Sequence, residues 1–273
     1  NYNTVVGDEA GTAITTGDGN VFTGYASGDA LTLGSSNTAI GRDSLGADTI
    51  GNHSVAIGRN ALTTQNFTSA TDAYNTAVGS SAGAAVTTGT SNTLIGGLAG
   101  DAITTGSQNT ATGYLALSAD TTGSQNTAYG RSSLVSNTTG ANNTASGYAS
   151  LASNTTGNYN TASGMYSLYV NSTASNNTAM GYESLKANTT GANNVAVGAT
   201  AGLALTTGSQ NVLIGEKAGD ALTTASDNVV MGRSALGSDT LGSKSVAIGR
   251  SALFTQNFTS ATDTYNTAVG YGA

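Results

Sequence analysis

Residues 75–91 read NTAVGSSAGAAVTTGTS, and the next repeat, 92–108, reads NTLIGGLAGDAITTGSQ. The opening pentapeptide NTAxG, or a close variant, recurs sixteen times along the 273 residues. Successive copies follow at a constant 17-residue spacing, except for two 21-residue intervals that begin at residues 54 and 245. The copies begin at residues 3, 20, 37, 54, 75, 92, 109, 126, 143, 160, 177, 194, 211, 228, 245 and 266. A short, constant period without intervening sequence indicates one supersecondary unit stacked on itself.

Two glycines divide each repeat, if the first residue of NTAxG is position one. Position five is Gly in all sixteen copies, and position fifteen is Gly in most of them. Glycines at fixed places predict corners where the backbone needs a positive φ or a close approach. We expect extended segments at positions one to five and eight to about fourteen, because both are too short for helices. The sequence therefore predicts an all-β fold, a parallel β-solenoid of 16 coils with a 17-residue period, roughly 75 Å long at about 4.8 Å per coil.

The pattern within a coil also predicts its core. Where position nine is Gly, position twelve is apolar, as in Gly83 with Val86; where position nine is Leu, position twelve is polar, as in Leu117 with Asp120. This exchange predicts one large apolar plug per coil, because a close-packed interior fixes its volume. Strand alternation separates position four, mainly apolar and expected in the core, from position three, usually Ala and expected to face outward. The Asn at position one is expected to bond its own coil and its counterparts in neighbouring coils.

A longer repeat lies above the short one. The stretch TQNFTSATD occurs at 64–72 and again at 255–263, a 191-residue offset. We interpret the chain as one continuous array, residues 1–273, with modules 3–74, 75–193 and 194–265. Because neither end carries a polar capping repeat, we expect either more repeats at both ends or copies stacked end to end.

The line of small residues at position three predicts how the chain assembles. Each coil has a thin core, so burial between chains is the expected source of further stability. We predict a parallel homotrimer in which these alanines face another chain, since small side chains let backbones approach closely. The alternative is a single-chain solenoid that polymerises end to end. The predicted interface consists of Ala39, Ala77, Ala128, Ala145, Ala162 and Ala179.

Composition excludes several classes of function. Charged residues are only 8% of the chain and the net charge is −7, so a basic nucleic-acid footprint is absent. No apolar run is long enough to predict membrane insertion. The single histidine, His53, has no Cys or second His beside it, and no nucleophile–base pair is visible. We therefore expect no cofactor, no metal and no enzyme activity. Arginines that follow position five, such as Arg42, are expected to pair with Asp43, Asp48 or Asp239; the alternative is a sparse polar ligand surface.

The two 21-residue turns are the candidate recognition elements. Their extra residues present Phe67 beside Tyr74 and Phe258 beside Tyr265. Long loops on a regular scaffold commonly carry recognition, so these aromatics predict binding of a host-cell surface glycan or receptor. In the alternative, each Phe folds back as a lid over its coil. Ice binding by the Thr-Thr pairs is a further alternative, opposed by the fact that adjacent residues of a strand point to opposite faces.

Several runs resemble known repeats. SVAIG at 54–58 and 245–249, with NTAVG at 75–79 and 266–270, resembles the head repeats of YadA-like trimeric autotransporter adhesins, although their period is shorter. NTASGYASLASNTTG at 143–157 is similar to repeats of phage and bacterial tail-fibre-like proteins. The resemblance implies a left-handed parallel β-roll in a homotrimer, extracellular on a cell surface or virion. Together with the uniform repetition, it predicts a structural shaft segment of a fibre or filament.

Overall fold

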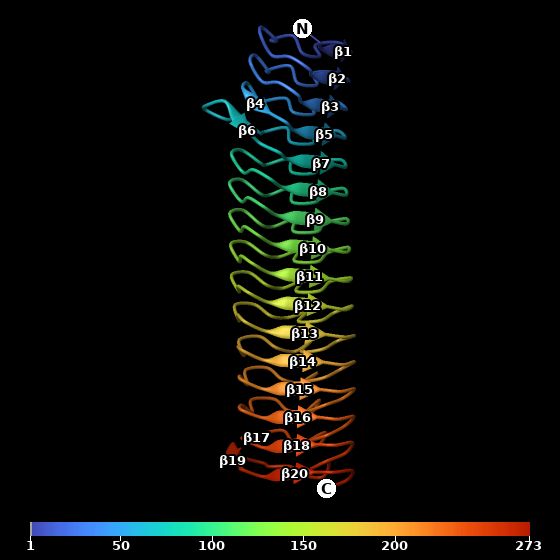
Figure 1. Ribbon diagram of the computed structural model, residues 1–273, viewed down its shortest axis with the longest axis vertical. Coiled ribbons are helices and arrows are strands. Elements are labelled where there is room, and N and C mark those ends of the chain that lie inside the picture. The colour runs from blue at the N-terminus through green and yellow to red at the C-terminus, as the bar shows by residue number, and fades with distance from the viewer. Residues whose placement is uncertain (1) are drawn as a thin grey trace. The chain divides into compact units, whose positions relative to one another are not determined.

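The computed structural model describes residues 2–273, which form an all-β parallel β-solenoid with no helix among them. The chain divides into two compact units, unit 1 ending at Thr139 and unit 2 beginning at Gly140, and each contains eight coils (Figure 1). Each coil contributes one three-residue strand at positions two to four. In unit 1 these are β1 (Thr4–Val6), β2 (Val21–Thr23), β3 (Thr38–Ile40), β5 (Val55–Ile57), β7 (Thr76–Val78), β8 (Thr93–Ile95), β9 (Thr110–Thr112) and β10 (Thr127–Tyr129). In unit 2 they are β11 (Thr144–Ser146), β12 (Thr161–Ser163), β13 (Thr178–Met180), β14 (Val195–Val197), β15 (Val212–Ile214), β16 (Val229–Met231), β18 (Val246–Ile248) and β20 (Thr267–Val269).

Within each unit, equal positions of successive coils lie in register. The pairing of β12 with β13, for example, is parallel and sets Ala162 opposite Ala179. Each position therefore forms a rank of side chains that repeats at the strand spacing of about 4.8 Å. The two long turns add short strand pairs at the corner before position one, β4 (Gly51–Asn52) with β6 (Thr71–Asp72) in unit 1 and β17 (Gly242–Ser243) with β19 (Thr262–Asp263) in unit 2.

The predicted glycine corners are confirmed. At position five, Gly96 has φ of +133° and a Cβ there would lie 2.6 Å from the carbonyl oxygen of Gly113 in the next coil. At position fifteen, a Cβ on Gly106 would lie 2.3 Å from the carbonyl oxygen of Gly123. The first corner thus needs both a positive φ and a close approach, whereas the second needs only the close approach.

The second predicted extended segment is wrong. Positions eight to twelve form turns, with left-handed residues at positions seven and nine, such as Ser132 (φ 57°) and Leu134 (φ 51°). Two positive-φ residues within three positions bend the chain and prevent a strand. Each coil therefore has one three-residue strand, and the wall opposite this strand is built from turns.

The strand faces are the reverse of the prediction. Position three points into the coil, and the six alanines assigned to an oligomer interface are fully buried there, so that assignment is wrong. They are Ala39, Ala77, Ala128, Ala145, Ala162 and Ala179. Position four points outward instead, and Ile40 and Ile95 are 38% and 40% exposed. The physical reason is volume, since the plug from the opposite wall already fills the narrow coil and leaves room for a small side chain. The largest residues at position three, Phe and Leu, accordingly face Gly at position nine, and a Cβ on Gly28 would lie 2.6 Å from the Phe22 ring.

The predicted plug is confirmed. Leu117 and Leu134 at position nine are fully buried, as are Val86 and Ile103 at position twelve. Among coils with Leu at position nine (Leu-type coils), those of 17 residues also bury their polar residue at position twelve fully, a feature not expected from the sequence. Asp48 and Asp239 therefore lie in the core, and the prediction that they pair with the corner arginines is wrong. The fully buried polar residues at position twelve of the 17-residue coils are Asp48, Asp120, Asn137, Asn154, Asn171, Asn188 and Asp239.

The asparagines at position one form the predicted ladder. The backbone N–H of Asn109 donates to Asn92 Oδ1 at 3.0 Å, which links one coil to the next. Its side-chain Nδ2 donates to the carbonyl oxygen of Gly123 at 2.9 Å, the position-fifteen corner of its own coil. Each buried amide thus satisfies its hydrogen bonds inside the coil and stabilises both the corner and the stack.

Candidate binding surfaces

The long turn of unit 1 is organised by a buried glutamine. Gln65 at position twelve donates through Nε2 to Asp48 Oδ2 (2.6 Å) and to Ser54 Oγ (2.8 Å). Its Oε1 accepts from Asn75 Nδ2 at 2.9 Å. The longer amide of Gln65 thus reaches position one of its own coil, which is Ser54 instead of the usual Asn, and position one of the next coil, Asn75. The replacement of Asn by Ser54 therefore follows from the space that Gln65 occupies.

Unit 2 repeats this network in the second copy of TQNFTSATD. Gln256 donates to Asp239 Oδ2 at 2.6 Å and to Ser245 Oγ at 3.2 Å, and it accepts from Asn266 at 2.7 Å. Both long turns consequently share one scaffold. Sequence reasoning missed this network, although the joint change to Gln at position twelve and Ser at position one of the same turn was a signal for it.

The phenylalanines and tyrosines of the long turns differ in exposure. Phe67 is buried, with 6% of its surface exposed, so the folded-back alternative is confirmed for it and its prediction as an exposed glycan-contacting ring is wrong. Phe258 is half-buried. Tyr74 and Tyr265 are 57% and 69% exposed. Of the four predicted ligand-binding residues, the two tyrosines are therefore the ones that present a ring to solvent.

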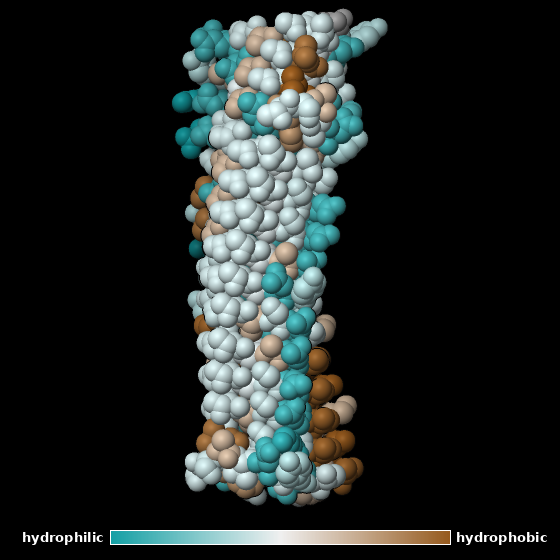
Figure 2. Space-filling view, turned by 90° about the vertical axis from the view of Figure 1, so that its left-hand side faces the viewer, coloured by the Kyte–Doolittle hydropathy of each residue, from teal (hydrophilic) through white to brown (hydrophobic). Residues whose placement is uncertain are grey.

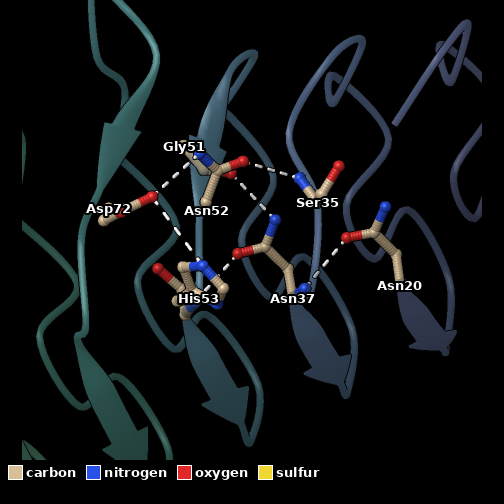
Figure 3. A network of polar contacts seen from close by, with 8 residues as sticks. Asn20, Ser35, Asn37, Gly51, Asn52, His53 and Asp72 are labelled. Carbon is tan, nitrogen blue, oxygen red and sulfur yellow. Dashed lines mark hydrogen bonds and ion pairs between the residues drawn. The ribbon is translucent and has the colours of Figure 1, made fainter. Parts of the chain in front are cut away.

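Tyr74 belongs to a small polar group at the corner of unit 1. The His53 ring stacks on Tyr74, with ring centroids 5.3 Å apart and planes 7° from parallel. His53 Nε2 lies 3.8 Å from Asp72 Oδ1, and the same oxygen accepts from Asn52 Nδ2 at 3.2 Å (Figure 3). His53 is thus a surface residue that contacts both an aromatic ring and a carboxylate.

The equivalent corner of unit 2 has a permanent cation. Lys244 Nζ donates to Asp263 Oδ2 at 2.6 Å and to the Tyr265 hydroxyl at 3.3 Å, and it lies 5.3 Å from the centroid of that ring. The hydrogen bond to Asp263, followed by the one to Tyr265, raises the pKa of Lys244. Each long turn therefore combines a tyrosine, a carboxylate and a nitrogen base. The longer repeat aligns His53 with Lys244, and this sequence signal was not used.

The outer face of the strands is a second candidate surface. Positions two and four of each coil, the first and last residues of its three-residue strand, point outward, and they are mostly Thr, Val, Ile or Met. Met231 and Ile248 in unit 2 are 40% and 36% exposed, and Val195 and Val212 are half-buried on the same face. Hydrophobic side chains gather along the lower right edge of Figure 2, at the level of the last coils of unit 2. We call positions two and four of the strands the outer sheet face.

The threonine pairs present one rank of hydroxyls to solvent, as predicted. The first Thr of a pair is used internally, because Thr121 Oγ1 donates to the carbonyl oxygen of Thr138 at 3.0 Å. The second, Thr122, is exposed. In Figure 2 the side of the molecule that faces the viewer is largely of neutral hydropathy.

The arrangement of ionisable groups is sparse. Within residues 2–273, no three His, Cys, Asp or Glu side chains lie close enough together to hold a metal ion. The same residues include no helix that is long and apolar enough to cross a membrane. Arg42 Nε pairs with Asp43 Oδ2 at 2.8 Å, and this predicted surface pair is confirmed.

Comparison of the chain with family models, with curated proteins and with solved structures found no match.

Proposed function

We propose that this chain is a structural shaft segment of an extracellular fibre or filament, on a virion or a cell surface, with no catalytic role. The observation that supports the proposal most is the outer sheet face, on which β14, β15, β16 and β18 present Val, Ile and Met side chains, half-buried or exposed, in four successive coils of unit 2. Parallel sheets are normally covered on both faces, and exposed contiguous apolar surface marks an interaction site. A surface of this kind along the repeats suits lateral association of identical chains.

The assembly that we propose is a parallel homotrimer of left-handed coils, as the resemblance to trimeric adhesin heads implies. Its interface is the outer sheet face and not the buried alanine line. Val and Ile ranks on three identical chains would pack against one another and remove this surface from water, at about 25 cal/mol for each Å² buried. The alternative assembly is a filament one chain thick, formed by pairing of the open strand edges at the ends of the array.

Mass measurement in solution tests the assembly. We expect a trimer whose mass does not change on dilution, and a change of Ile214→Lys with Ile248→Lys should dissociate it, because charges would then face the apolar centre. The matched control is Thr190→Lys with Thr207→Lys, two exposed sites in the same unit off the outer sheet face. A trimer that survives the isoleucine changes would place the interface elsewhere. A ladder of lengths one chain thick would favour the filament.

Small-angle scattering tests the shaft role separately. An elongated particle is expected, with a maximum dimension that grows with the number of repeats expressed. A compact, near-spherical particle would contradict the proposal.

A second candidate function is adhesion to a glycan or receptor through the long turns. It is favoured by the exposed tyrosine beside a nitrogen base and a carboxylate in both units, Tyr74 with His53 and Tyr265 with Lys244. Binding to a glycan array should be lost on Tyr74→Ala with Tyr265→Ala. Phe67→Ala is not a suitable test, because it opens a cavity in the coil. Array binding that is unchanged by the two tyrosine substitutions would reject this assignment.

A further inference from the structure

Four tyrosines gather on three successive coils of unit 2. Tyr148 and Tyr182 occupy position six of their coils, and Tyr166 and Tyr169 occupy positions seven and ten of the coil between them. Tyr148 and Tyr182 are 41% and 46% exposed, while Tyr166 and Tyr169 are half-buried. We call these four residues the tyrosine cluster. It lies past the position-five glycines and is distinct from the long turns and from the outer sheet face.

The Tyr166 ring lies nearly at right angles to the Tyr148 and Tyr169 rings. The Tyr148 and Tyr166 rings lie 5.3 Å apart at 82°, and the Tyr166 and Tyr169 rings lie 5.2 Å apart at 88°. The backbone N–H of Tyr166 donates to the carbonyl oxygen of Tyr148 at 3.1 Å, which fixes the two coils relative to each other. Edge-to-face packing of this type is favourable, and Tyr148 and Tyr182 keep a large part of their surface exposed. The cluster is therefore a preorganised aromatic surface.

The fold does not require tyrosine at these positions. Position seven has a left-handed backbone in every coil, yet its residue in unit 2 is otherwise small or charged. Those residues are Ala149, Glu183, Thr200, Lys217, Ser234, Ser251 and Gly272. At position ten, the neighbouring coils have Ala152 and Lys186. Since coils with these side chains adopt the same backbone, the fold does not account for the phenol rings of Tyr166 and Tyr169.

The charges beside the cluster compensate each other. Lys186 Nζ pairs with Glu183 Oε1 at 2.6 Å and lies 5.5 Å from the centroid of the Tyr166 ring. The surface thus offers a carboxylate, an ammonium group and phenols without a net local charge. The hydrogen bond with Tyr148, ahead of burial, raises the pKa of Tyr166. Such a surface suits an uncharged ligand that has both apolar faces and many hydroxyl groups.

We propose that the tyrosine cluster binds a neutral oligosaccharide. The C–H faces of pyranose rings would pack on Tyr148 and Tyr182, while sugar hydroxyls would bond to the phenols and to Glu183 and Lys186. Tyrosine suits such contacts, because its rigid amphipathic ring loses little conformational entropy on binding. Tyr148 and Tyr182 are two coils apart, about 10 Å at the strand spacing, which requires several linked sugar units to contact both rings. The proposal is independent of the shaft role and of the long turns.

The test is a printed array of neutral hexose and N-acetylhexosamine oligosaccharides with their sialylated counterparts, probed with the assembled protein. We expect binding to a neutral oligosaccharide that weakens at least tenfold on Tyr148→Ala with Tyr182→Ala, measured by titration calorimetry with the glycan found. Tyr148→Phe with Tyr182→Phe should weaken it less, since the rings remain. Tyr159→Ala, which removes an exposed tyrosine elsewhere in unit 2, should have no effect. Unchanged thermal unfolding of the variants would show that the fold is intact.

Four results would overturn the proposal. The first is the absence of binding to any neutral oligosaccharide, and the second is a preference for the sialylated probes. The third is binding that is lost on Tyr74→Ala with Tyr265→Ala but retained in the cluster variants, which would assign recognition to the long turns. If the cluster variants instead change the mass of the assembly, the surface is an interface between copies of the chain, and the proposal also fails.

Discussion

Replacement of Asp120 by asparagine should stabilise unit 1 at neutral pH. Asp120 is fully buried at position twelve, where its Oδ2 accepts from Asn137 Nδ2 (2.8 Å) and Asn126 Nδ2 (3.2 Å), and its Oδ1 accepts from the N–H of Gly123 (2.7 Å). Asparagine already occupies position twelve in other coils. There Asn171 Nδ2 donates to a carbonyl oxygen of its own coil at 3.1 Å and to Asn154 Oδ1 at 3.0 Å. The substituted coil can form the first of these bonds, while Ile103 at position twelve of the preceding coil offers no acceptor for the second.

The magnitude follows from the pKa. Burial raises the pKa of Asp120 from 3.8 to about 6, against the hydrogen bonds from Asn137, Gly123 and Asn126, which lower it. Because the folded-state value lies above the unfolded one, the folded chain binds the proton more tightly. The stability that this group contributes is greatest below about pH 4, falls as the pH rises to about 6, and is constant above that. A shift of about two units corresponds to at most about 3 kcal/mol.

Denaturant unfolding of the wild type and of Asp120→Asn, measured from pH 4 to pH 8, tests this reasoning. We expect the variant to gain up to about 3 kcal/mol over the wild type above pH 7, and the gain to shrink steadily below pH 6. The other buried acids titrate in both proteins and cancel in the difference. A gap that is independent of pH, or a variant that is less stable at pH 8, would refute the claim that a buried charge at this site costs stability.

Three further predictions concern the coil itself. Ala162→Leu should destabilise unit 2 by about 1–3 kcal/mol through overpacking, where an interface role would change the mass of the assembly at constant stability; unfolding together with mass measurement separates these outcomes. Gly96→Ala should be strongly destabilising because of its positive φ and the close carbonyl of the next coil, whereas its neighbour Gly97→Ala, with no atom closer than 3.6 Å, should be tolerated; similar midpoints for the two variants would contradict the corner geometry. Leu185→Gly should cost about 2–5 kcal/mol, and adding Asn188→Leu should restore at least half of it by supplying the plug from position twelve; a double variant no more stable than the single one would contradict the exchange.

The repeat pattern was sufficient to predict the architecture. A fixed period, glycines at positions five and fifteen and the exchange at positions nine and twelve predict a parallel solenoid with one plug per coil, and the structure has these features. These features depend on backbone geometry and on volume, which glycine and leucine report directly. The ladder at position one was predictable for the same reason, because an amide in every coil has few other partners.

The direction in which the strand faces point was not predictable from alternation. Period-two alternation separates Ala162 from its neighbours, but it does not say which face is inside. The usual expectation that larger apolar residues are buried led to the wrong choice, since a narrow coil has room for one large side chain, and that one comes from the opposite wall. Phe22 and Leu94 at position three, each facing Gly at position nine, were the signal that position three shares the interior with the plug.

The buried polar residues at position twelve follow a directional rule that explains where aspartate occurs. Each run of Leu-type coils in the sequence begins with an aspartate, Asp48, Asp120 or Asp239, and continues with asparagine or glutamine. In each case the amide of the following coil donates to this aspartate, as Asn137 does to Asp120. The first member has no polar side chain before it at position twelve, because the preceding coil places an apolar plug there. A carboxylate has only acceptors. It accepts hydrogen bonds from the amide of the following coil and from the N–H at position fifteen of its own coil, so it needs no partner in the preceding coil.

At the other end of a run, the amide oxygen of the last polar side chain needs a hydrogen-bond donor from the coil that follows the run. Gln65 is long enough for its Oε1 to accept from Asn75 of the next coil, and Gln256 does the same with Asn266. Asn188 is shorter and precedes a coil with Leu205 at position twelve, and its Oδ1 is buried without a partner. An unpaired buried acceptor costs roughly 1–3 kcal/mol. Buried hydrogen bonding therefore affects where a Leu-type run can end, and we expect the coil of Asn188 to be a weaker end than the coils of Gln65 and Gln256.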